Sequence, residues 1–377
     1  MKKRMTIGLI AILFLTGCTT PPIPQAETPD EPPEVIVVET PETAVETTET
    51  EAEPEELPPE ETTEPAMPEP ETVEPQTNEP ERELSVADYF PPFENAIRTF
   101  KGVGIEYASY SVRTEYIQDD LVQFHNNNGG TETVNVFRVS DDEVRLIFTE
   151  SENYSRLNRL SETRPSQERI LIQGPLEVGH SWEDPVMGQS TIIRLDEPIV
   201  ILGTELVRAL VIESQDVINY FAPGYGLVKT VYPEHDISST LDKIEVNTAY
   251  QERIDLVHLD DEARPMGTTV TFDMNTNESL LEKLSQALRR PRPDGLDLPE
   301  GFDITSITKE PFSQQIYVDI TPGIYDWDVG ATDELNHLKE LSLTLRGYFT
   351  AEEFYLSVDG ADYDSGSLQL DRTIPLK

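Results

Sequence analysis

The chain has 377 residues, with 72 acidic against 28 basic side chains and a formal net charge of −44. A charge of this size repels phosphate backbones, which excludes nucleic acid as an expected partner. The chain also has only one cysteine, which excludes a disulfide within it.

The first 17 residues are expected to form an export signal. A basic stretch at 2–4 precedes an apolar run over 7–15, far short of the ~20 apolar residues that span a bilayer. The next residues, LTGC at 15–18, resemble the bacterial lipobox. That resemblance implies cleavage after Gly17 and a diacylglyceryl group on Cys18, whose two acyl chains suffice for stable attachment. An ordinary export signal with a free thiol is the alternative.

Residues 18–85 are predicted to be a disordered tether. Between 19 and 83 there are 15 prolines and 21 acidic residues, with a net charge of −20. Such a segment cannot bury enough apolar surface to offset the entropy of ordering it. We expect a spacer that holds the folded part away from the membrane. A solubilising segment and an O-glycosylated stalk are the alternatives.

Residues 86–250 are predicted to form a mostly antiparallel β module. Short alternating or β-branched runs are separated by turn residues, and NNNGG at 126–130 suits the positive φ angles of a hairpin. Gly224 and Gly226 around Tyr225 predict another tight turn. The expected strands are 106–117, 121–126, 131–139, 143–150, 169–173, 190–195, 198–203, 206–214, 217–222, 226–232 and 239–246.

A linker is expected over 251–266, and residues 267–377 are predicted to form a second module. Its periodicity changes to a β-α-β-β-α-β order, which favours a small sandwich with both helices on one face of a sheet. Thr332 is the expected N-cap of the second helix. The expected strands are 268–274, 303–310, 314–321 and 354–360, and the expected helices are 277–290 and 331–349.

The C-terminal module resembles the GerMN domain of spore formation and germination. The stretches that carry the resemblance are LEKLSQALRRP, LPEGFDITSITKEPFSQQIYVDI, DELNHLKELSLTLRGYF and EEFYLSVDGADYDSG. The preceding module, with GVGIEYASY, PLEVGHSW and YFAPGYGLVKTVY, is similar to a β-rich domain found before GerMN in lipoproteins. The predicted fold class is therefore α+β: a mostly antiparallel β module and then an α/β-sandwich GerMN domain, after the acidic tether.

The sequence offers no pattern typical of catalysis or of metal binding. The five histidines lack metal-ligand spacing, and the cysteine belongs to the lipobox. DGADYDSGS at 359–367 has calcium-like acid spacing but lacks the glutamate that ends an EF-hand loop, so a hairpin turn is the favoured interpretation. We therefore expect no enzyme activity, no metal and no cofactor.

Four residues are candidates for contacts with partners. Trp327 and Tyr325 lie in the acidic insertion GIYDWDVGAT, and aromatic anchors dominate interfaces. Packing onto the second helix is the alternative for both. Glu334, which opens that helix, and Tyr225 complete the set. A wider groove for glycan or peptide is a further interpretation for the aromatic residues of the β module, against burial in its core: Trp182, Tyr220, Phe221, Tyr225 and Tyr232.

Together these features predict a lipoprotein on the outer face of the cell membrane, with a non-catalytic binding or scaffold role in the envelope. The expected partners are the membrane, through the lipid anchor, and other envelope proteins, with peptidoglycan as a further candidate. The GerMN resemblance implies sporulation, germination or cell-wall assembly. The alternative function is a solute- or peptidoglycan-fragment-binding lipoprotein that uses the β-rich module.

Overall fold

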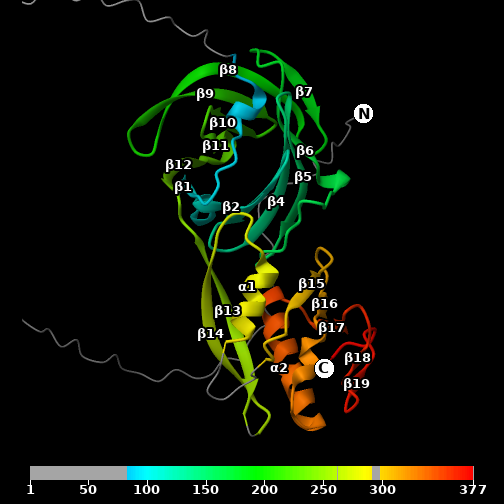
Figure 1. Ribbon diagram of the computed structural model, residues 1–377. Coiled ribbons are helices and arrows are strands. Elements are labelled where there is room, and N and C mark those ends of the chain that lie inside the picture. The colour runs from blue at the N-terminus through cyan, green and yellow to red at the C-terminus, as the bar shows by residue number, and fades with distance from the viewer. Residues whose placement is uncertain (1–82, 261, 291–297, 377) are drawn as a thin grey trace, which may run out of the picture. The chain divides into compact units, whose positions relative to one another are not determined.

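A computed structural model describes residues 83–260, 262–290 and 298–376 (Figure 1). Gly17, Cys18 and the acidic tract up to residue 82 lie outside these residues. The described part of the chain contains nineteen strands and two α-helices. None of its helices has the length and apolar composition needed to cross a bilayer.

The expected α+β fold class is wrong, because strands dominate the described residues. Twelve strands form one antiparallel sheet, in the order β6-β5-β4-β3-β2-β1-β12-β11-β10-β9-β8-β7. Their bounds are β1 (Ile97–Val103), β2 (Tyr110–Gln118), β3 (Leu121–Asn127), β4 (Glu132–Val139), β5 (Glu143–Ser151), β6 (Arg169–Gln173), β7 (Ser181–Asp184), β8 (Gly188–Ile201), β9 (Glu205–Ser214), β10 (Val217–Ala222), β11 (Gly226–Tyr232) and β12 (Ile237–Glu245). Short 3₁₀ helices lie at Val86–Tyr89, Glu106–Ala108, Pro165–Gln167, Pro233–His235 and Pro322–Asp326.

The two edge strands of this sheet, β6 and β7, are joined by side chains. The indole Nε1 of Trp182 in β7 donates to the carbonyl of Ile170 in β6 over 3.0 Å. The N–H of Ile170 donates to the carboxylate of Asp184 over 2.5 Å. These bonds satisfy part of the open edges, and the sheet curves around an apolar core that includes Phe100, Phe124 and Trp182.

The predicted turns of this sheet are confirmed. Asn128 and Thr131 close the turn between β3 and β4, where Gly129 has a φ of 83°. Gly224 and Gly226 have φ angles of 76° and 74° in the turn between β10 and β11. Glycine adopts such angles without a steric penalty, which explains its place at both turns.

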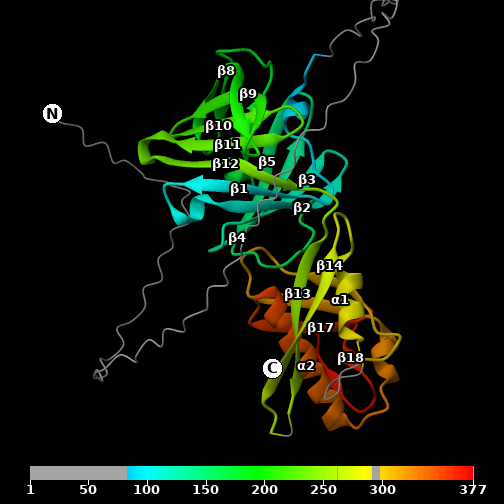
Figure 2. The same cartoon turned by 90° about the vertical axis from the view of Figure 1, so that its left-hand side faces the viewer.

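A long hairpin follows, formed by β13 (Tyr250–Leu259) and β14 (Pro265–Met274). It occupies the stretch 251–266 that we expected to be a linker. The two strands pair over ten residues without a register shift, and they run side by side in both ribbon views (Figures 1 and 2). Charged residues hide the β signal of β13, because Arg253 and Asp255 alternate with the buried Ile254 and Leu256.

The rest of the chain forms a three-stranded sheet with two helices. The order is β15-β16-β17, with β15 and β16 antiparallel and β16 and β17 parallel. Both helices were predicted, although Gly330 and not Thr332 is the N-cap of the second. The bounds are α1 (Leu280–Leu288), β15 (Ile304–Thr308), β16 (Gln315–Ile320), α2 (Ala331–Phe349) and β17 (Glu353–Val358), followed by a small hairpin of β18 (Tyr363–Asp364) and β19 (Gln369–Leu370).

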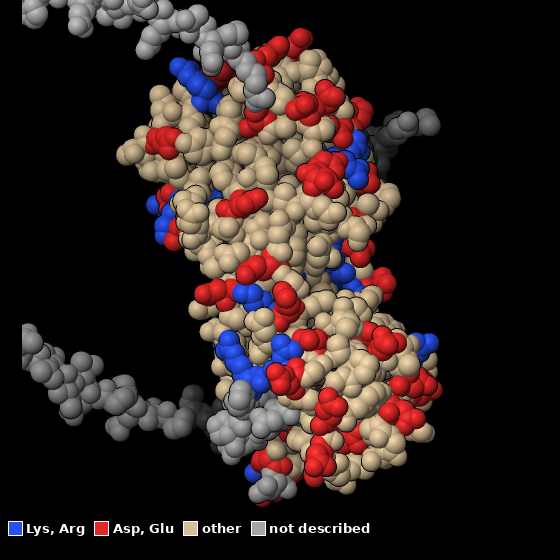
Figure 3. Space-filling model, in the orientation of Figure 1, with Lys and Arg blue, Asp and Glu red and all other residues tan. Residues whose placement is uncertain are grey.

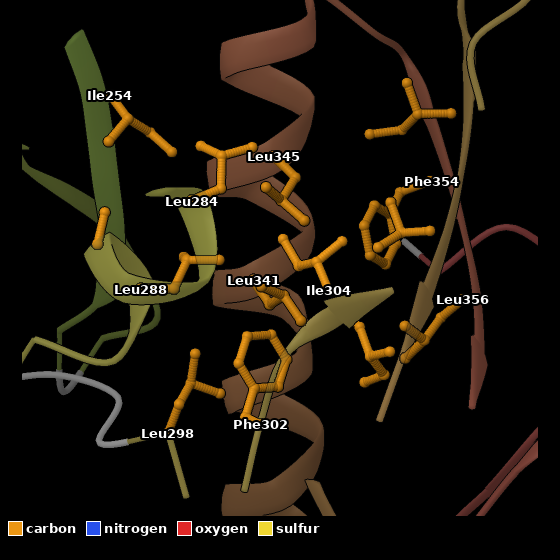
Figure 4. Packing of buried hydrophobic residues seen from close by; sticks show 14 of the residues in the cluster. Ile254, Leu284, Leu288, Leu298, Phe302, Ile304, Leu341, Leu345, Phe354 and Leu356 are labelled. Atoms are coloured by element: carbon orange, nitrogen blue, oxygen red, sulfur yellow. The ribbon is translucent and has the colours of Figure 1, made fainter. Parts of the chain in front are cut away.

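The expected α/β-sandwich GerMN arrangement is therefore not found, and β14 accounts for the difference. β14 was expected to join the same sheet as β15, β16 and β17, but among the described residues it pairs only with β13. A ten-residue neighbour joined by a short turn offers β14 a complete ladder at low loop-closure cost. The hairpin then adds apolar side chains, among them Ile254, to the core between the helices and the three-stranded sheet. Leu341 and Leu345 of α2 occupy its centre (Figure 4).

Candidate functional site

A cluster of buried charges lies where β2, β3 and β4 meet β13. We call it the charged cluster and define it by Arg113, Glu115, His125, Glu132 and Glu252. The side chains of Glu115 and His125 have no exposed surface, whereas that of Glu132 is 19% exposed. Burial of so many ionisable groups is costly unless they are paired, so their contacts decide what the cluster does.

Glu115 and Arg113 are the centre of the pairing. Arg113 Nε donates to Glu115 Oε1 over 3.1 Å, and Gln123 Nε2 donates to Glu115 Oε2 over 2.8 Å. Arg113 Nη2 also lies 3.7 Å from the carboxylate of Glu252 in β13, and its guanidinium stacks 3.6 Å above the ring of Tyr250. Arg113 therefore connects the large sheet to the hairpin.

His125 lies between two carboxylates. Its Nδ1 is 3.0 Å from Glu115 Oε1, and its Nε2 is 2.6 Å from Glu132 Oε2, a close ion pair that is not aligned as a hydrogen bond. Arg113 Nη2 is 3.1 Å from the same Nδ1. Since two cations cannot bond to each other, Glu115 is the partner of the protonated ring.

The pKa values follow from these contacts. Burial alone would lower the pKa of His125, but the carboxylates of Glu115 and Glu132 together outweigh burial and the nearby Arg113, and they raise it. Burial alone would raise the pKa of Glu115, but His125 and Arg113 outweigh burial and hold it well below its ordinary value. Burial raises the pKa of Glu252, and Arg113 offsets only part of that effect. The charged cluster thus links the large sheet to the hairpin inside the protein. A substrate has no access to Glu115 or His125, because their side chains have no exposed surface.

An open cleft of about 510 Å³ lies next to the charged cluster. Arg156 lines it and donates from Nη2 to the carbonyls of Glu115 and Asn275. The walls are mixed, with Ile117, Leu160, Leu281 and Ile307 among the apolar residues and Asn158, Asn277 and Ser279 among the polar ones. No nucleophile with an adjacent base lies among these residues, so the cleft offers binding contacts but no recognisable catalytic pair.

An open aromatic surface lies on the face of the three-stranded sheet away from the helices. We call it the tyrosine face and define it by Gln315, Tyr317, Asp319, Glu353 and Tyr355. Tyr317 and Tyr355 are register partners on β16 and β17, and their rings stack at 4.6 Å with an angle of 16°. Tyr317 is 43% exposed.

Hydrogen bonds fix the polar groups of the tyrosine face. Tyr355 donates its hydroxyl to Glu353 over 2.8 Å, which raises the pKa of that phenol to about 12. Tyr317 donates to Gln315 over 3.0 Å. Asp319 accepts hydrogen bonds from Ser357 and from Thr305, each over 2.6 Å. The face thus combines aromatic rings with oriented amide and carboxylate groups, which suits ligands with both apolar C–H surface and hydroxyl groups.

Trp327 and Tyr325 both pack against the apolar core of the second module. The ring of Trp327 lies 5.4 Å from that of His337 in α2. The ring of Tyr325 lies 5.2 Å from that of Tyr363, and its hydroxyl accepts a bond from the N–H of Asp364 over 3.2 Å. Both residues thus pack within the second module, in line with the alternative to a partner contact, and part of each side chain is accessible.

Glu334 and Tyr225 are held by internal partners. Glu334 is 4% exposed and accepts a hydrogen bond from the hydroxyl of Tyr363 over 2.5 Å. Tyr225 donates its hydroxyl to Glu205, which raises the pKa of the phenol. Neither lies at the tyrosine face, which sequence reasoning missed. The alternation in QQIYVDI and EFYLSV carried the only signal for it.

The aromatic residues of the β module do not line one groove. Trp182 and Phe221 belong to the core of the large sheet, with exposures of 6% and 1%. Among the described residues, no group of three or more His, Cys, Asp and Glu side chains is arranged to hold a metal ion. The acidic run at 359–367 instead leads into the hairpin of β18 and β19.

Comparisons with known proteins give little guidance. No protein-family model matches the chain, including any for the GerMN domain. No curated protein matches it. Among solved structures, the crystal structure of a "Putative Lipoprotein from Clostridium perfringens" is similar over 34% of this chain and 86% of that chain, with 19% sequence identity and a TM-score of 0.22. At that TM-score the likeness supports no inference about fold or function.

Proposed function

We propose that this chain is an extracytoplasmic lipoprotein, anchored to the outer face of the cell membrane, whose folded part works by binding and not by catalysis. The observation that carries the proposal is the LTGC stretch at 15–18 behind a basic and then apolar leader. The proline-rich acidic tract that follows suits a spacer between the lipid and the folded residues.

The character of the ionisable groups supports a binding role. Glu115 has a strongly lowered pKa, but it is fully buried within ion pairs. Perturbed groups at an active site normally face a cleft that substrate can enter. The exposed polar groups of the tyrosine face are instead held in fixed hydrogen bonds, which suits recognition.

Lipid labelling tests the anchor. Cells that express the full chain are grown with radiolabelled palmitate, next to cells that express Cys18→Ser. We expect label in the first protein only, and we expect the first protein in the membrane fraction. Equal fractionation of the two proteins without label in either would contradict the anchor.

We propose the glycan chains of the cell wall as the partner of the tyrosine face. Sugar rings present C–H groups that stack on aromatic rings, and hydroxyl groups that bond to amides and carboxylates. Tyr317 and Tyr355 offer the stacking surface, and Gln315 and Glu353 lie within hydrogen-bonding distance of their hydroxyls. The acidic character of the molecular surface in Figure 3 favours an uncharged or basic partner over an anionic one.

Sedimentation with purified peptidoglycan tests this partner. The full chain is expected to co-sediment with the insoluble wall, and Tyr317→Ala with Tyr355→Ala is expected to weaken the affinity about tenfold, which corresponds to the loss of about 1.4 kcal/mol. Tyr232→Ala is the matched control, because Tyr232 is 38% exposed on the large sheet. Equal binding by the double variant and the control would exclude the tyrosine face as the site.

A further inference from the structure

No described strand pairs with the outer edge of β14, which runs along a stretch without charged residues. Asp260 N–H donates to the carbonyl of Arg264 at the turn, so residues 260 and 264 face each other across the hairpin. Backbone groups alternate in direction along an antiparallel strand. The N–H and C=O groups of Gly267, Thr269 and Thr271 therefore point away from β13.

The other side of the hairpin supports this assignment. By the same alternation, Val257 and Leu259 in β13 direct their N–H groups outward, and both find acceptors in α2. Val257 donates to Thr344 over 2.8 Å, and Leu259 donates to Glu340 over 2.7 Å. The outer edge of β13 is thus covered by side chains of α2. Within the described part of the chain, no residue accepts a hydrogen bond from the N–H of Gly267, Thr269 or Thr271.

The edge of β14 also lacks the usual protection. Proteins commonly protect edge strands with charges, bulges or internal proline. Between Pro265 and Phe272 the sequence PMGTTVTF has no charged residue, and its only proline is the first residue of the strand. Gly267, Thr268, Thr269 and Thr271 are exposed, and Met266 is 51% exposed. By contrast, β8, which β7 covers only over residues 188–191, contains Pro198 and two register shifts in the part beyond β7.

We propose that β14 pairs with β14 of a second copy of this chain, antiparallel about a twofold axis at Thr269. The two hairpins then form a four-stranded sheet in the order β13-β14-β14-β13. This inference does not depend on the proposed anchor or on the glycan partner, because it uses only the geometry of the hairpin.

Self-complementarity favours a second copy as the occupant. With the axis at Thr269, Gly267 lies opposite Thr271 of the second copy, and the exposed Met266 lies opposite Phe272 of the second copy. No two charged residues face each other within this register, and threonine is a favourable residue at cross-strand pairs. Asp273 lies opposite Pro265 at the end of this register. A shift of the axis to Thr271 would instead bring Asp273 opposite Thr269, close to the axis.

The net charge makes this association weak and gives it a characteristic salt dependence. The leader carries +3 and the acidic tract −20, so residues 84–377 carry −27 of the −44 total. Two such bodies repel each other, and salt screens that repulsion. Dimerisation is therefore strengthened by salt, whereas an interface held by opposite charges would be weakened.

Sedimentation velocity on the full chain with Cys18→Ser tests the pairing. We expect a dimer whose fraction rises with protein concentration and also rises between about 0.02 M and about 0.5 M NaCl. Thr269→Pro removes the outward N–H without removing a hairpin bond and is expected to abolish the dimer. Thr269→Val is the matched control, because both variants lose the hydroxyl bond to Asp255 while only the proline loses the N–H.

Cysteine cross-linking tests the register without reliance on the proline variant. In the Cys18→Ser chain, Thr269→Cys places two thiols opposite each other at about 5.5 Å between Cα atoms, within the range of a disulfide. Thr271→Cys separates the two thiols by four residues along the strands, or about 13 Å. We expect oxidation to cross-link the first variant and not the second.

Three results would overturn the proposal. The first is a full chain that stays monomeric at protein concentrations up to about 1 mM, because the free energy of dissociation would then be below about 4 kcal/mol. In that case the edge of β14 would be free to pair with a different polypeptide. Equal dimerisation of the proline and valine variants is another. Cross-linking by Thr271→Cys in place of Thr269→Cys is the third.

Discussion

The strand β13 enters two buried regions of opposite chemistry. Glu252 lies in the charged cluster beside Arg113, whereas Ile254 and Leu256, two and four residues later on the same face, lie in the apolar core of the second module. All three side chains are at most 5% exposed. Equal burial therefore has very different energetic consequences along one strand.

The difference shows how the hairpin is held in register. Apolar contacts stabilise by area and are not directional, so a core of leucine and isoleucine tolerates a shifted neighbour. Ion pairs in a buried site are directional, and a shift of β13 by two residues would place Ile254 where Glu252 faces Arg113. We infer that the apolar core supplies most of the stabilisation and that the charged cluster selects the register.

The largest expected effect comes from removal of Glu115. Glu115→Gln leaves Arg113 and His125 buried without their shared carboxylate, and breaking a buried ion pair costs about 3–5 kcal/mol. Urea denaturation measures the loss in the free energy of unfolding. Glu143→Gln is the control, because the side chain of Glu143 is 25% exposed in its pair with Arg145 and such pairs contribute about 1 kcal/mol or less. Equal effects of the two changes would show that the cluster has no special role.

A somewhat smaller effect is expected in the apolar core. Leu341→Ala removes a side chain that is 1% exposed at the centre of the core, and a leucine-to-alanine change of this kind costs about 2–5 kcal/mol. Leu206→Ala, at a residue 63% exposed, is expected to cost about 0.5 kcal/mol or less. If the comparison of the two regions holds, Leu341→Ala lowers stability but leaves the salt and pH dependence of unfolding unchanged. A change in the salt dependence or the pH dependence would show that the apolar core and the charged cluster are energetically coupled.

Much of the element list was predictable from the sequence, because local patterns carry it. The apolar spacing of Leu338, Leu341 and Leu345 predicted α2 at its observed bounds, and the β-branched runs predicted most strands of the large sheet. The pairing of those strands was not predictable, since it depends on contacts far apart in the chain. β13 was missed because Glu252, Arg253 and Asp255 make it look like a solvated linker.

The charged cluster was also not predictable from the sequence. Glu115 and His125 lie ten residues apart on neighbouring strands, and Glu252, which pairs with Arg113, comes from a hairpin more than a hundred residues later. Nothing local marks these residues as buried, since Arg113, Glu115 and His125 each suit an exposed strand position. The tyrosine face was missed for a different reason. The alternation of apolar and polar residues shows that the side chain of Tyr317 points away from the core, but it does not show that Tyr355 stacks on Tyr317.

A pH effect of intermediate size is expected from His125. Its pKa in the folded state is raised above the ordinary 6.5, so the folded state holds this proton more tightly than the unfolded state does. The resulting stabilisation is fully present below pH 6.5 and is lost as the pH rises through the folded pKa, by at most about 1.4 kcal/mol per pH unit for one proton. Glu115, Glu132 and Arg113 are the charged groups that face the ring.

Urea denaturation between pH 6 and 9 measures this slope, and His125→Gln is expected to flatten it. The raised pKa of Glu252 gives a slope of the same sign, beginning near its ordinary value of 4.5. A slope that persists above pH 6.5 in His125→Gln would therefore assign the proton to Glu252. Glu115, with its lowered pKa, acts in the opposite direction: its stabilisation is present above pH 4.5 and is lost as the pH falls through its folded pKa.

The smallest expected effect lies at the outer edge of β13, where its backbone bonds to side chains of α2. Thr344→Val keeps the shape of the side chain in α2 but removes the hydroxyl that accepts from the N–H of Val257. Loss of one such bond costs about 1 kcal/mol. Hydrogen exchange is the sharper measurement, because the amide of Val257 should exchange faster while the amides of Ile254 and Leu256, which face β14, keep their protection. Faster exchange along the whole strand would mean that the contact with α2 stabilises all of β13. The contacts between β13 and α2 would then join the apolar core and the charged cluster as a third contribution that holds the hairpin in place.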